Sequence, residues 1–282
     1  MNKILVMVDF SVNANQIAEY AFKLASCLKM DIVLHCCFQH IVSIPALRGD
    51  GWSEESLIVN QNAGIERLRQ LSVTTRKLAE TFAPDAYLPS VRYQWVNGIF
   101  DPLLLNYNQN DKVNLLISGS HQKTPSTLME DWIKKLVDRT GLTLLLIPPG
   151  MEFKPFKKIV FVTMLKEDEY RSVCEVIKFA DIFKSEIVLT RVVSNRQVRT
   201  CCAKKYFDDL MHLSRYNRIS YQERYQDGPP DLTKLSMQIP HDLLALVRRS
   251  RSLQNENRAM ALQQIAPLLI CRKEVVNKPT QL

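Results

Sequence analysis

Residues 3–35 read KILVMVDFSVNANQIAEYAFKLASCLKMDIVLH, and this stretch decides the fold. It opens with an apolar run at residues 4–8 and closes with a second one at residues 32–35. Both runs are continuous rather than alternating, which is typical of parallel strands that are buried on both faces of a sheet. The stretch therefore predicts a β-α-β unit.

The segment between the two runs has the spacing of a helix. Its apolar side chains recur every three or four positions, at Ile17, Tyr20, Ala21, Leu24 and Leu28. Just before this stripe, Asn13 and Gln16 stand three residues apart, a spacing that predicts a capping box at the helix N-terminus. The stripe is expected to pack against the sheet.

The same unit recurs without gaps 155 residues later. Residues 158–190 read KIVFVTMLKEDEYRSVCEVIKFADIFKSEIVLT. Three further predicted strands follow each copy in the same order, at residues 90–96, 114–118 and 143–147, and at residues 218–225, 242–246 and 267–271. A repeated supersecondary unit predicts tandem copies of one fold. The expected fold class is α/β, with two tandem five-stranded parallel-sheet domains and flanking helices.

The domain boundaries follow from the breaks between these runs. We place the first domain at residues 1–149, a linker at 150–157, the second domain at 158–274 and a tail at 275–282. Paired prolines end a strand, and Pro148 and Pro149 mark where the linker begins. A second helix of the first domain is predicted over residues 53–82, and another helix between the fourth and fifth strands.

Composition limits the class of protein. The chain of 282 residues is 46% hydrophobic and 23% charged, which excludes a disordered or collagen-like protein. Its longest apolar runs are far shorter than the roughly 18 residues that a membrane helix needs. The seven cysteines show no Cys-x-x-Cys spacing and the five histidines stand singly. We therefore expect a cytoplasmic protein that binds neither a membrane nor a metal.

The net charge of +8 is unevenly distributed. Residues 1–150 hold 14 basic and 14 acidic side chains, whereas residues 151–282 hold 23 basic and 15 acidic ones. Such a surplus can attract phosphates, nucleic acid or an acidic partner, or it can be a solvated surface. Nucleic acid is the weakest of these alternatives, because no predicted helix combines a basic face with interleaved aromatics and no reader motif is present.

Several stretches together resemble universal stress proteins. They are MNKILVMVDFS at residues 1–11, IVLH at 32–35, LLISGSH at 115–121 and APLLI at 266–270. The resemblance extends over both halves and implies a tandem universal stress protein. It implies in each half the Rossmann-like fold of the adenine nucleotide alpha hydrolase type.

The resemblance also provides a pattern for an ATP site. Family members that bind ATP carry an acidic residue after the first strand and, after the fourth, a Gly-x-x-Gly loop, nine residues and a Gly-Ser or Gly-Thr pair. Glycines in such a loop let backbone N–H groups approach phosphates. In the first half Asp9 and Gly119 match, but three positions do not and hold Gln122, Trp132 and Ile133. The turn that begins Gly119–Ser120–His121 keeps one glycine and two polar side chains, so it is either a plain turn or a site for a smaller ligand.

The second half departs further from this pattern. Met164 stands in place of the acidic residue, and Val247, Arg248 and Arg249 stand in place of the loop that begins at Gly119. Arg248, Arg249 and Arg251 are candidates for holding an anion by charge and forked hydrogen bonds, and the alternative is a solvated turn. Arg191, Arg196 and Arg199 form a second group of arginines, after the second strand of this half.

Function is predicted from these matches and mismatches. No nucleophile elbow, Walker loop or His-Glu-x-x-His motif is present, so we expect no enzyme. The leading hypothesis is a non-catalytic stress-response protein with a degenerate ATP site in both halves and no cofactor. The alternatives are ATP binding retained in the first half and anion or nucleic-acid binding by the second. The resemblance implies that the two halves pair as an internal pseudo-dimer and that chains can form a homodimer. The leading hypothesis adds association with an unidentified protein partner or a small ligand.

Overall fold

The structure of the chain is a computed structural model. It describes residues 2–8, 11–37, 61–96, 113–119, 137, 141–164, 169–194, 207–210, 215–226, 232–247 and 266–271. The chain divides into two compact units, Met1–Lys154 and Pro155–Leu282, which are described one at a time. The boundary between them falls inside the segment predicted as a linker.

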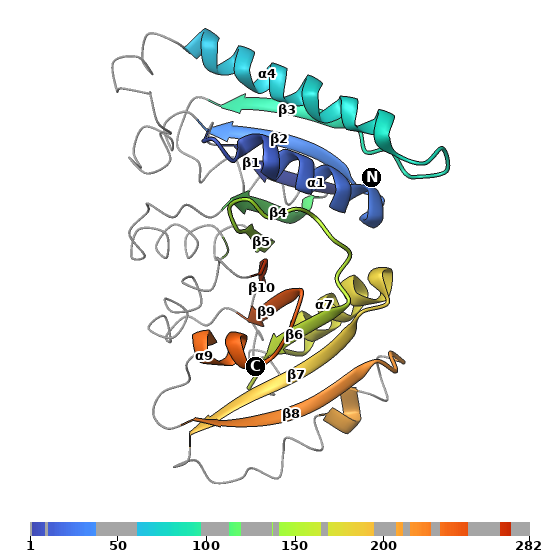
Figure 1. Cartoon of the computed structure of the whole chain (residues 1–282), viewed down its shortest axis with the longest axis vertical. Coiled ribbons are helices and arrows are strands. Elements are labelled where there is room, and N and C mark those ends of the chain that lie inside the picture. Colours follow the sequence, from blue (N-terminus) through green and yellow to red (C-terminus); the bar gives the residue numbers. More distant parts are fainter. Residues whose placement is uncertain are drawn as a thin grey trace, which may run out of the picture. The chain divides into compact units, whose positions relative to one another are not determined.

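The described residues of the first unit form five parallel strands, whose arrangement can be followed in Figure 1. Its elements are β1 (Lys3–Met7), α1 (Ala14–Leu28), β2 (Asp31–Cys37), α4 (Gln61–Lys77), a 3-10 turn (Leu78–Thr81), β3 (Val91–Val96), β4 (Val113–Gly119) and β5 (Thr143–Ile147). The strands are ordered β3-β2-β1-β4-β5, and every pair of neighbours is parallel. The predicted α/β class with a parallel sheet is confirmed.

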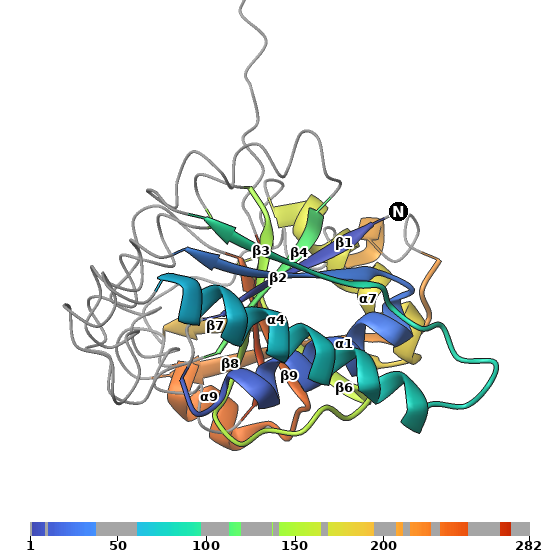
Figure 2. The same ribbon diagram turned by 90° about the horizontal axis from the view of Figure 1, so that it is seen from above.

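Helices α1 and α4 cover one face of this sheet, where they lie side by side (Figure 2). The predicted stripe of α1 is its buried side, because Ile17, Tyr20 and Leu24 are at most 4% exposed. The predicted second helix is present as α4, and residues 53–60 lie outside the described part of the chain. The helix predicted between the fourth and fifth strands also lies outside it, apart from Val137.

The second unit repeats this arrangement. Its elements are β6 (Lys158–Val162), α7 (Tyr170–Phe183), β7 (Glu186–Ser194), β8 (Ile219–Gln226), α9 (Leu232–Gln238), β9 (Leu243–Val247) and β10 (Leu268–Cys271). The order of its strands is β10-β9-β6-β7-β8, again with parallel neighbours. Helix α9 was not predicted from the sequence.

The offset of 155 residues relates the two units in detail. Strands β1 and β6 begin at Lys3 and Lys158, and the helices that follow them both end at a lysine in the left-handed conformation. The φ angle is 53° at Lys29 and 54° at Lys184. A non-glycine residue in this region is uncommon, so its recurrence indicates that both helices end in the same kind of turn.

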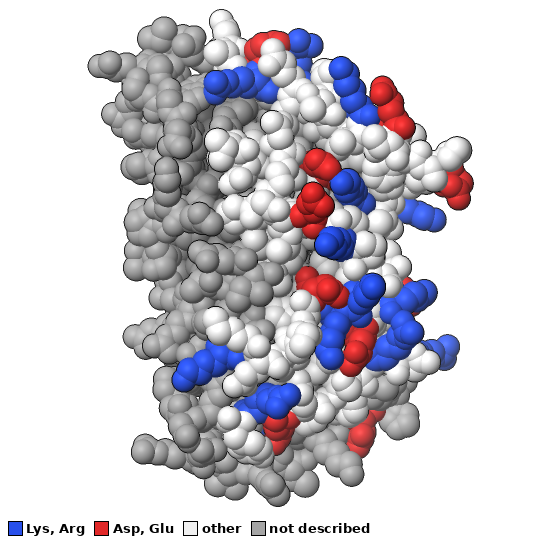
Figure 3. Space-filling model, viewed as in Figure 1, with Lys and Arg blue, Asp and Glu red and all other residues white. Residues whose placement is uncertain are grey.

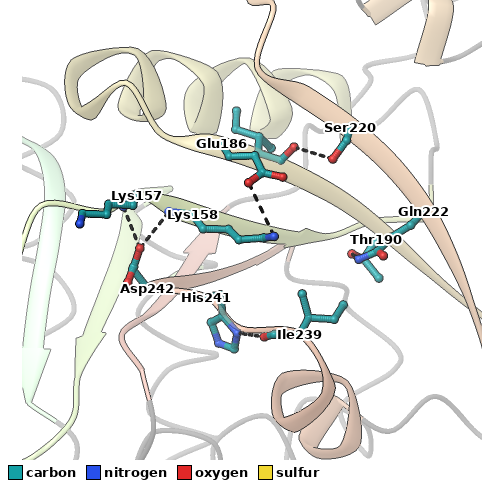
Figure 4. A network of polar contacts seen from close by, with 10 residues as sticks. Lys157, Lys158, Glu186, Thr190, Ser220, Gln222, Ile239, His241 and Asp242 are labelled. Atoms are coloured by element: carbon teal, nitrogen blue, oxygen red, sulfur yellow. Dashed lines mark hydrogen bonds and ion pairs between the residues drawn. The ribbon is translucent and has the colours of Figure 1, made fainter.

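One carboxylate binds the backbone at the amino ends of the strands in the second unit (Figure 4). Asp242, just before β9, accepts hydrogen bonds from the backbone N–H groups of Lys157 and Lys158, at 2.8 and 2.9 Å. The side chain of Lys158 lies 3.6 Å from the carboxylate of Glu186 at the start of β7. These contacts fix how β6, β7 and β9 begin.

The capping box predicted at the start of α1 is wrong. Asn13 makes no side-chain hydrogen bond to the helix N-terminus, and the side chain of Gln16 instead contacts residues 148–151. Those residues follow β5, about 130 positions further along the chain. A long-range partner has therefore replaced the local one that the spacing suggested. Among the described helices, none is long and apolar enough to cross a membrane.

Candidate ligand site at the carboxyl ends of the strands

The topology of the first unit defines a switch point between β1 and β4. The chain runs from β1 to β2 and β3 on one side of the sheet, and β4 and β5 lie on the other side of β1. In open α/β sheets ligands bind outside the carboxyl ends of the strands at such a point. Asp9 follows β1 and Gly119 ends β4, so both predicted site residues belong to this edge in chain order.

Gly119 lies directly against helix α1. A Cβ atom added at Gly119 would lie 3.2 Å from Cγ1 and 3.3 Å from Cδ1 of Ile17, which is tighter than ordinary contacts. Glycine at this position therefore has a packing role, since it lets the first turn of α1 approach the end of β4. That role accounts for the glycine without any ligand.

A backbone hydrogen bond connects the carboxyl end of β1 to β2. The N–H group of Val8 donates to the carbonyl oxygen of His35 at 2.8 Å, and the side chain of His35 is fully buried. This places Asp9 one residue beyond an anchored position. The remaining residues of the predicted nucleotide pattern lie outside the described part of the chain: Asp9, Ser120, His121, Gln122, Trp132 and Ile133.

In the second unit the switch point lies between β6 and β9, and a carboxylate is buried beside it. Glu169, at the start of α7, is 1% exposed. Its Oε2 atom accepts a hydrogen bond from the hydroxyl of Thr163 at 2.5 Å and another from the backbone N–H of Met164 at 2.9 Å. Thr163 and Met164 are the two residues that follow β6.

Glu169 changes the interpretation of this half. Met164 stands where the first unit has Asp9, yet a carboxylate reaches the same turn from five residues further along. It takes up one backbone donor, and its charge is favourably placed at the N-terminus of a helix. The sequence signal was an acidic residue immediately before the helix, and the repeat hid it because Glu169 aligns with Ala14.

Arg191 is paired within the sheet. Its Nη1 atom lies 3.5 Å from Oε1 of Glu223 on the neighbouring strand, and the two side chains are 12% and 26% exposed. Glu223 also accepts hydrogen bonds from the hydroxyls of Tyr221 and Tyr225, at 2.7 and 3.0 Å. Burial, followed by the hydrogen bond to Glu223, raises the pKa of Tyr221. Arg191 therefore forms an ion pair with Glu223 across the two strands.

The other predicted arginines cannot be placed. Arg196, Arg199, Arg248, Arg249 and Arg251 lie outside the described residues, so anion binding by them stays a prediction. On the face shown in Figure 3, basic and acidic side chains of the described residues are interspersed. The surplus of positive charge in the second half belongs mostly to residues that the structure does not describe.

The described part of the chain has thiols but no cluster of metal ligands. It contains no group of three or more His, Cys, Asp or Glu side chains that could hold a metal ion. Cys271, at the end of β10, is fully buried, and this burial, with a further contribution from Glu175, raises the pKa of its thiol. A buried neutral thiol is unreactive. Cys201 and Cys202 lie outside the described residues.

Comparison with solved structures assigns the fold. A universal stress protein from Archaeoglobus fulgidus matches with a TM-score of 0.69 and 10% identity, covering 96% of each chain. A chain assigned to the universal stress proteins from Pseudomonas aeruginosa matches with a TM-score of 0.56 and 14% identity, over 97% of this chain and 94% of the other. The cytoplasmic domain of a prokaryotic cation chloride cotransporter matches with a TM-score of 0.54 and 11% identity, over 95% and 94%.

Neither protein-family models nor curated protein sequences match the chain. The similarity is therefore visible in three dimensions and not in overall sequence. At these identities it shows the fold, which is that of universal stress proteins, as the resemblance in the sequence implied.

Proposed function

We propose that the chain is a non-catalytic, cytoplasmic stress-response protein of the universal stress protein type whose two ATP sites have degenerated. It acts by association with a protein partner rather than by turnover. The cytoplasmic domain of a prokaryotic cation chloride cotransporter has a similar fold, and there the fold is one domain of a larger protein. This occurrence supports a role in association with other protein domains. Pairing of the two halves as a pseudo-dimer, and of two chains as a homodimer, belong to the same proposal.

The observation that carries the proposal is the buried carboxylate of Glu169. A nucleotide phosphate at the switch point of the second unit would meet this negative charge, and the N–H group of Met164 is already engaged by it. Like charges at close range in a buried setting are strongly unfavourable. In the first unit the departures at Gln122, Trp132 and Ile133 support the same conclusion from the sequence.

The first alternative is that the first unit binds ATP through Asp9 and Gly119. The specific observation in its favour is that β1 and β4 flank the switch point. Asp9 follows β1 in the sequence, and Gly119 is the last residue of β4. The packing of Gly119 against Ile17 weighs against it, since the glycine is already explained.

The second alternative is anion or nucleic-acid binding by the second half. Residues 195–206, which follow β7, contain Arg196, Arg199, Lys204 and Lys205 and no acidic residue. Residues 248–251, which follow β9, contain three arginines. The carboxyl ends of parallel strands share one edge, so both basic segments begin at the same edge of the second sheet.

The experiment is calorimetric titration of the purified full chain with ATP and magnesium, after mass spectrometry for co-purified nucleotide. Asp9→Ala tests the predicted site, and Asp85→Ala, at an exposed aspartate remote from it, is the matched control. We expect no binding heat and no bound nucleotide. Micromolar binding that Asp9→Ala abolishes and Asp85→Ala preserves would overturn the proposal in favour of the first alternative.

The second alternative needs its own titration. Inorganic phosphate, ATP without magnesium and a single-stranded oligonucleotide are added at low and high salt. Binding that weakens with salt and disappears in the double variant Arg248→Ala, Arg249→Ala would establish it. ATP binding that persists in this double variant and in Asp9→Ala would contradict the proposal and both alternatives.

A further inference from the structure

The first turn of α1 touches two segments that are far apart in sequence. On one side Ile17 packs against Gly119 at the end of β4. On the other side its neighbour Gln16 contacts residues 148–151, which follow β5 and lead into the linker predicted at 150–157. The two contacts come from consecutive residues, so a displacement of this turn affects both.

Gln16 holds the linker through both ends of its amide group. The Nε2 atom donates to the carbonyl oxygen of Met151 at 2.5 Å and points to that of Pro148 at 3.5 Å. The Oε1 atom accepts a hydrogen bond from the N–H group of Gly150 at 3.0 Å. A single side chain thus satisfies backbone groups across a four-residue turn.

The conformation of the turn matches this contact. Gly150 has a φ of +72°, which an L side chain rarely adopts, and a Cβ atom at that position would meet nothing within 4 Å. Glycine is therefore needed there for its backbone angle and not for space. One helical turn beyond Gln16, the ring of Tyr20 meets the ring of Phe153 edge-on, at 5.3 Å between centroids.

We propose that the first turn of α1 couples the carboxyl end of β4 to the linker: displacing Ile17 from Gly119 releases residues 148–151 from Gln16. The linker then has two states, docked on α1 and undocked. Among the contacts of the described residues, the Gln16 amide group is the one that links α1 to the backbone of this turn, and Gly150 is itself exposed, so we expect the turn to open locally without unfolding the unit. A ligand at the switch point would act through this coupling only if the first unit binds one, as in the first alternative above.

The N–H group of Gly150 reports the docked state directly, because its acceptor is Gln16. Residue-resolved hydrogen exchange by NMR on the full chain measures it without any ligand. We expect Gln16→Ala to speed hydrogen exchange at the N–H group of Gly150 about threefold to tenfold, because one exposed hydrogen bond is lost. Glu19→Gln, at a half-buried position one turn further along α1 where the carboxylate accepts a hydrogen bond from Lys23, is the matched control and leaves the rate unchanged.

Coupling is tested at a residue that does not touch the linker. In Gly119→Ala the new methyl group displaces Ile17, and we expect exchange at Gly150 to speed about twofold or more. Ile17→Val removes the Cδ1 atom that approaches Gly119 and serves as the second variant if Gly119→Ala fails to fold. An unchanged rate at Gly150 in Gln16→Ala would overturn the docked linker.

An unchanged rate in a folded Gly119→Ala or Ile17→Val chain would overturn the coupling while leaving the linker contact standing. None of these measurements contains nucleotide. Failure of the coupling is therefore distinguishable from the outcome of the ATP titration.

Discussion

The hydroxyl of Thr163 donates a 2.5 Å hydrogen bond to the carboxylate of Glu169, and both side chains are at most 2% exposed. Because the same carboxylate also accepts the N–H of Met164, its removal leaves two donors beside the end of β6 without this acceptor. Unsatisfied buried polar groups are among the few causes of large destabilisation by a single substitution.

We therefore expect Glu169→Ala to destabilise the chain by about 2–3 kcal/mol. Glu169→Gln keeps an acceptor of the same shape and serves as the matched variant, with an expected loss of about 1 kcal/mol. Urea denaturation followed by far-UV circular dichroism measures both. Tryptophan fluorescence serves as an internal comparison, because Trp52, Trp95 and Trp132 all belong to the first unit. Equal midpoints for Glu169→Ala and the wild type would contradict the buried contact.

Gly64 gives a prediction about the first unit. A Cβ atom at Gly64, in α4, would lie 2.4 Å from Cη2 of Trp95 on the edge strand β3. Alanine has a higher helix propensity than glycine by about 1 kcal/mol, so a helix considered alone would gain stability from the change. In the folded chain we expect Gly64→Ala to cost about 1–3 kcal/mol, because the ring of Trp95 has to move.

A double-mutant cycle separates the two effects. In a Trp95→Val background the ring is absent, and there Gly64→Ala is expected to become neutral or stabilising. Urea denaturation followed by circular dichroism gives the four free energies of unfolding. Equal effects of Gly64→Ala in both backgrounds would show that Trp95 does not restrict this position.

Most strands could be predicted closely because they are continuous apolar runs, whereas the edge strands β3 (VRYQWV) and β8 (ISYQERYQ) mix polar and apolar residues. The fifth strand of the first unit was predicted at residues 143–147, and β5 is Thr143–Ile147. Helix α9 was missed because its sequence, LTKLSMQ, is short and has no clear apolar stripe. The prediction of a capping box failed for a different reason, since Gln16 has partners more than 130 positions away that no local pattern can indicate.

The candidate site was predictable only in its topology. The order of the elements predicts that Asp9 and Gly119 lie at one edge of the sheet, and the structure describes Gly119 there at the end of β4. Two contacts were not visible in the sequence, that of Gly119 with Ile17 and that of Glu169 with the turn after β6. Both are made by helices packing on strand ends, and their geometry depends on the tertiary structure rather than on spacing.

Asp31, at the start of β2, contributes to the pH dependence of the first unit. Burial raises the pKa of its carboxyl group, but hydrogen bonds from the N–H of Ser90 at 2.9 Å and the hydroxyl of Tyr87 at 3.1 Å, with the charge of Arg92, outweigh burial. The net pKa in the folded chain is lowered. Ionised Asp31 therefore contributes stability above the pKa of an unfolded aspartate, about 3.9, and this contribution is lost as the pH falls through the lowered value.

We expect the first unit to lose stability between pH 5 and pH 2, and Asp31→Asn to flatten that loss. The variant is less stable than the wild type at pH 7, since an amide binds these donors less strongly than a carboxylate, and the difference shrinks toward pH 2. Urea denaturation at pH 7, 5, 3 and 2, followed by tryptophan fluorescence, measures both chains. Asp85→Asn, at an exposed aspartate of the same unit, is the control and should follow the wild type. A difference between wild type and Asp31→Asn that is equally large at pH 7 and pH 2 would show that the hydrogen bonds do not depend on ionisation.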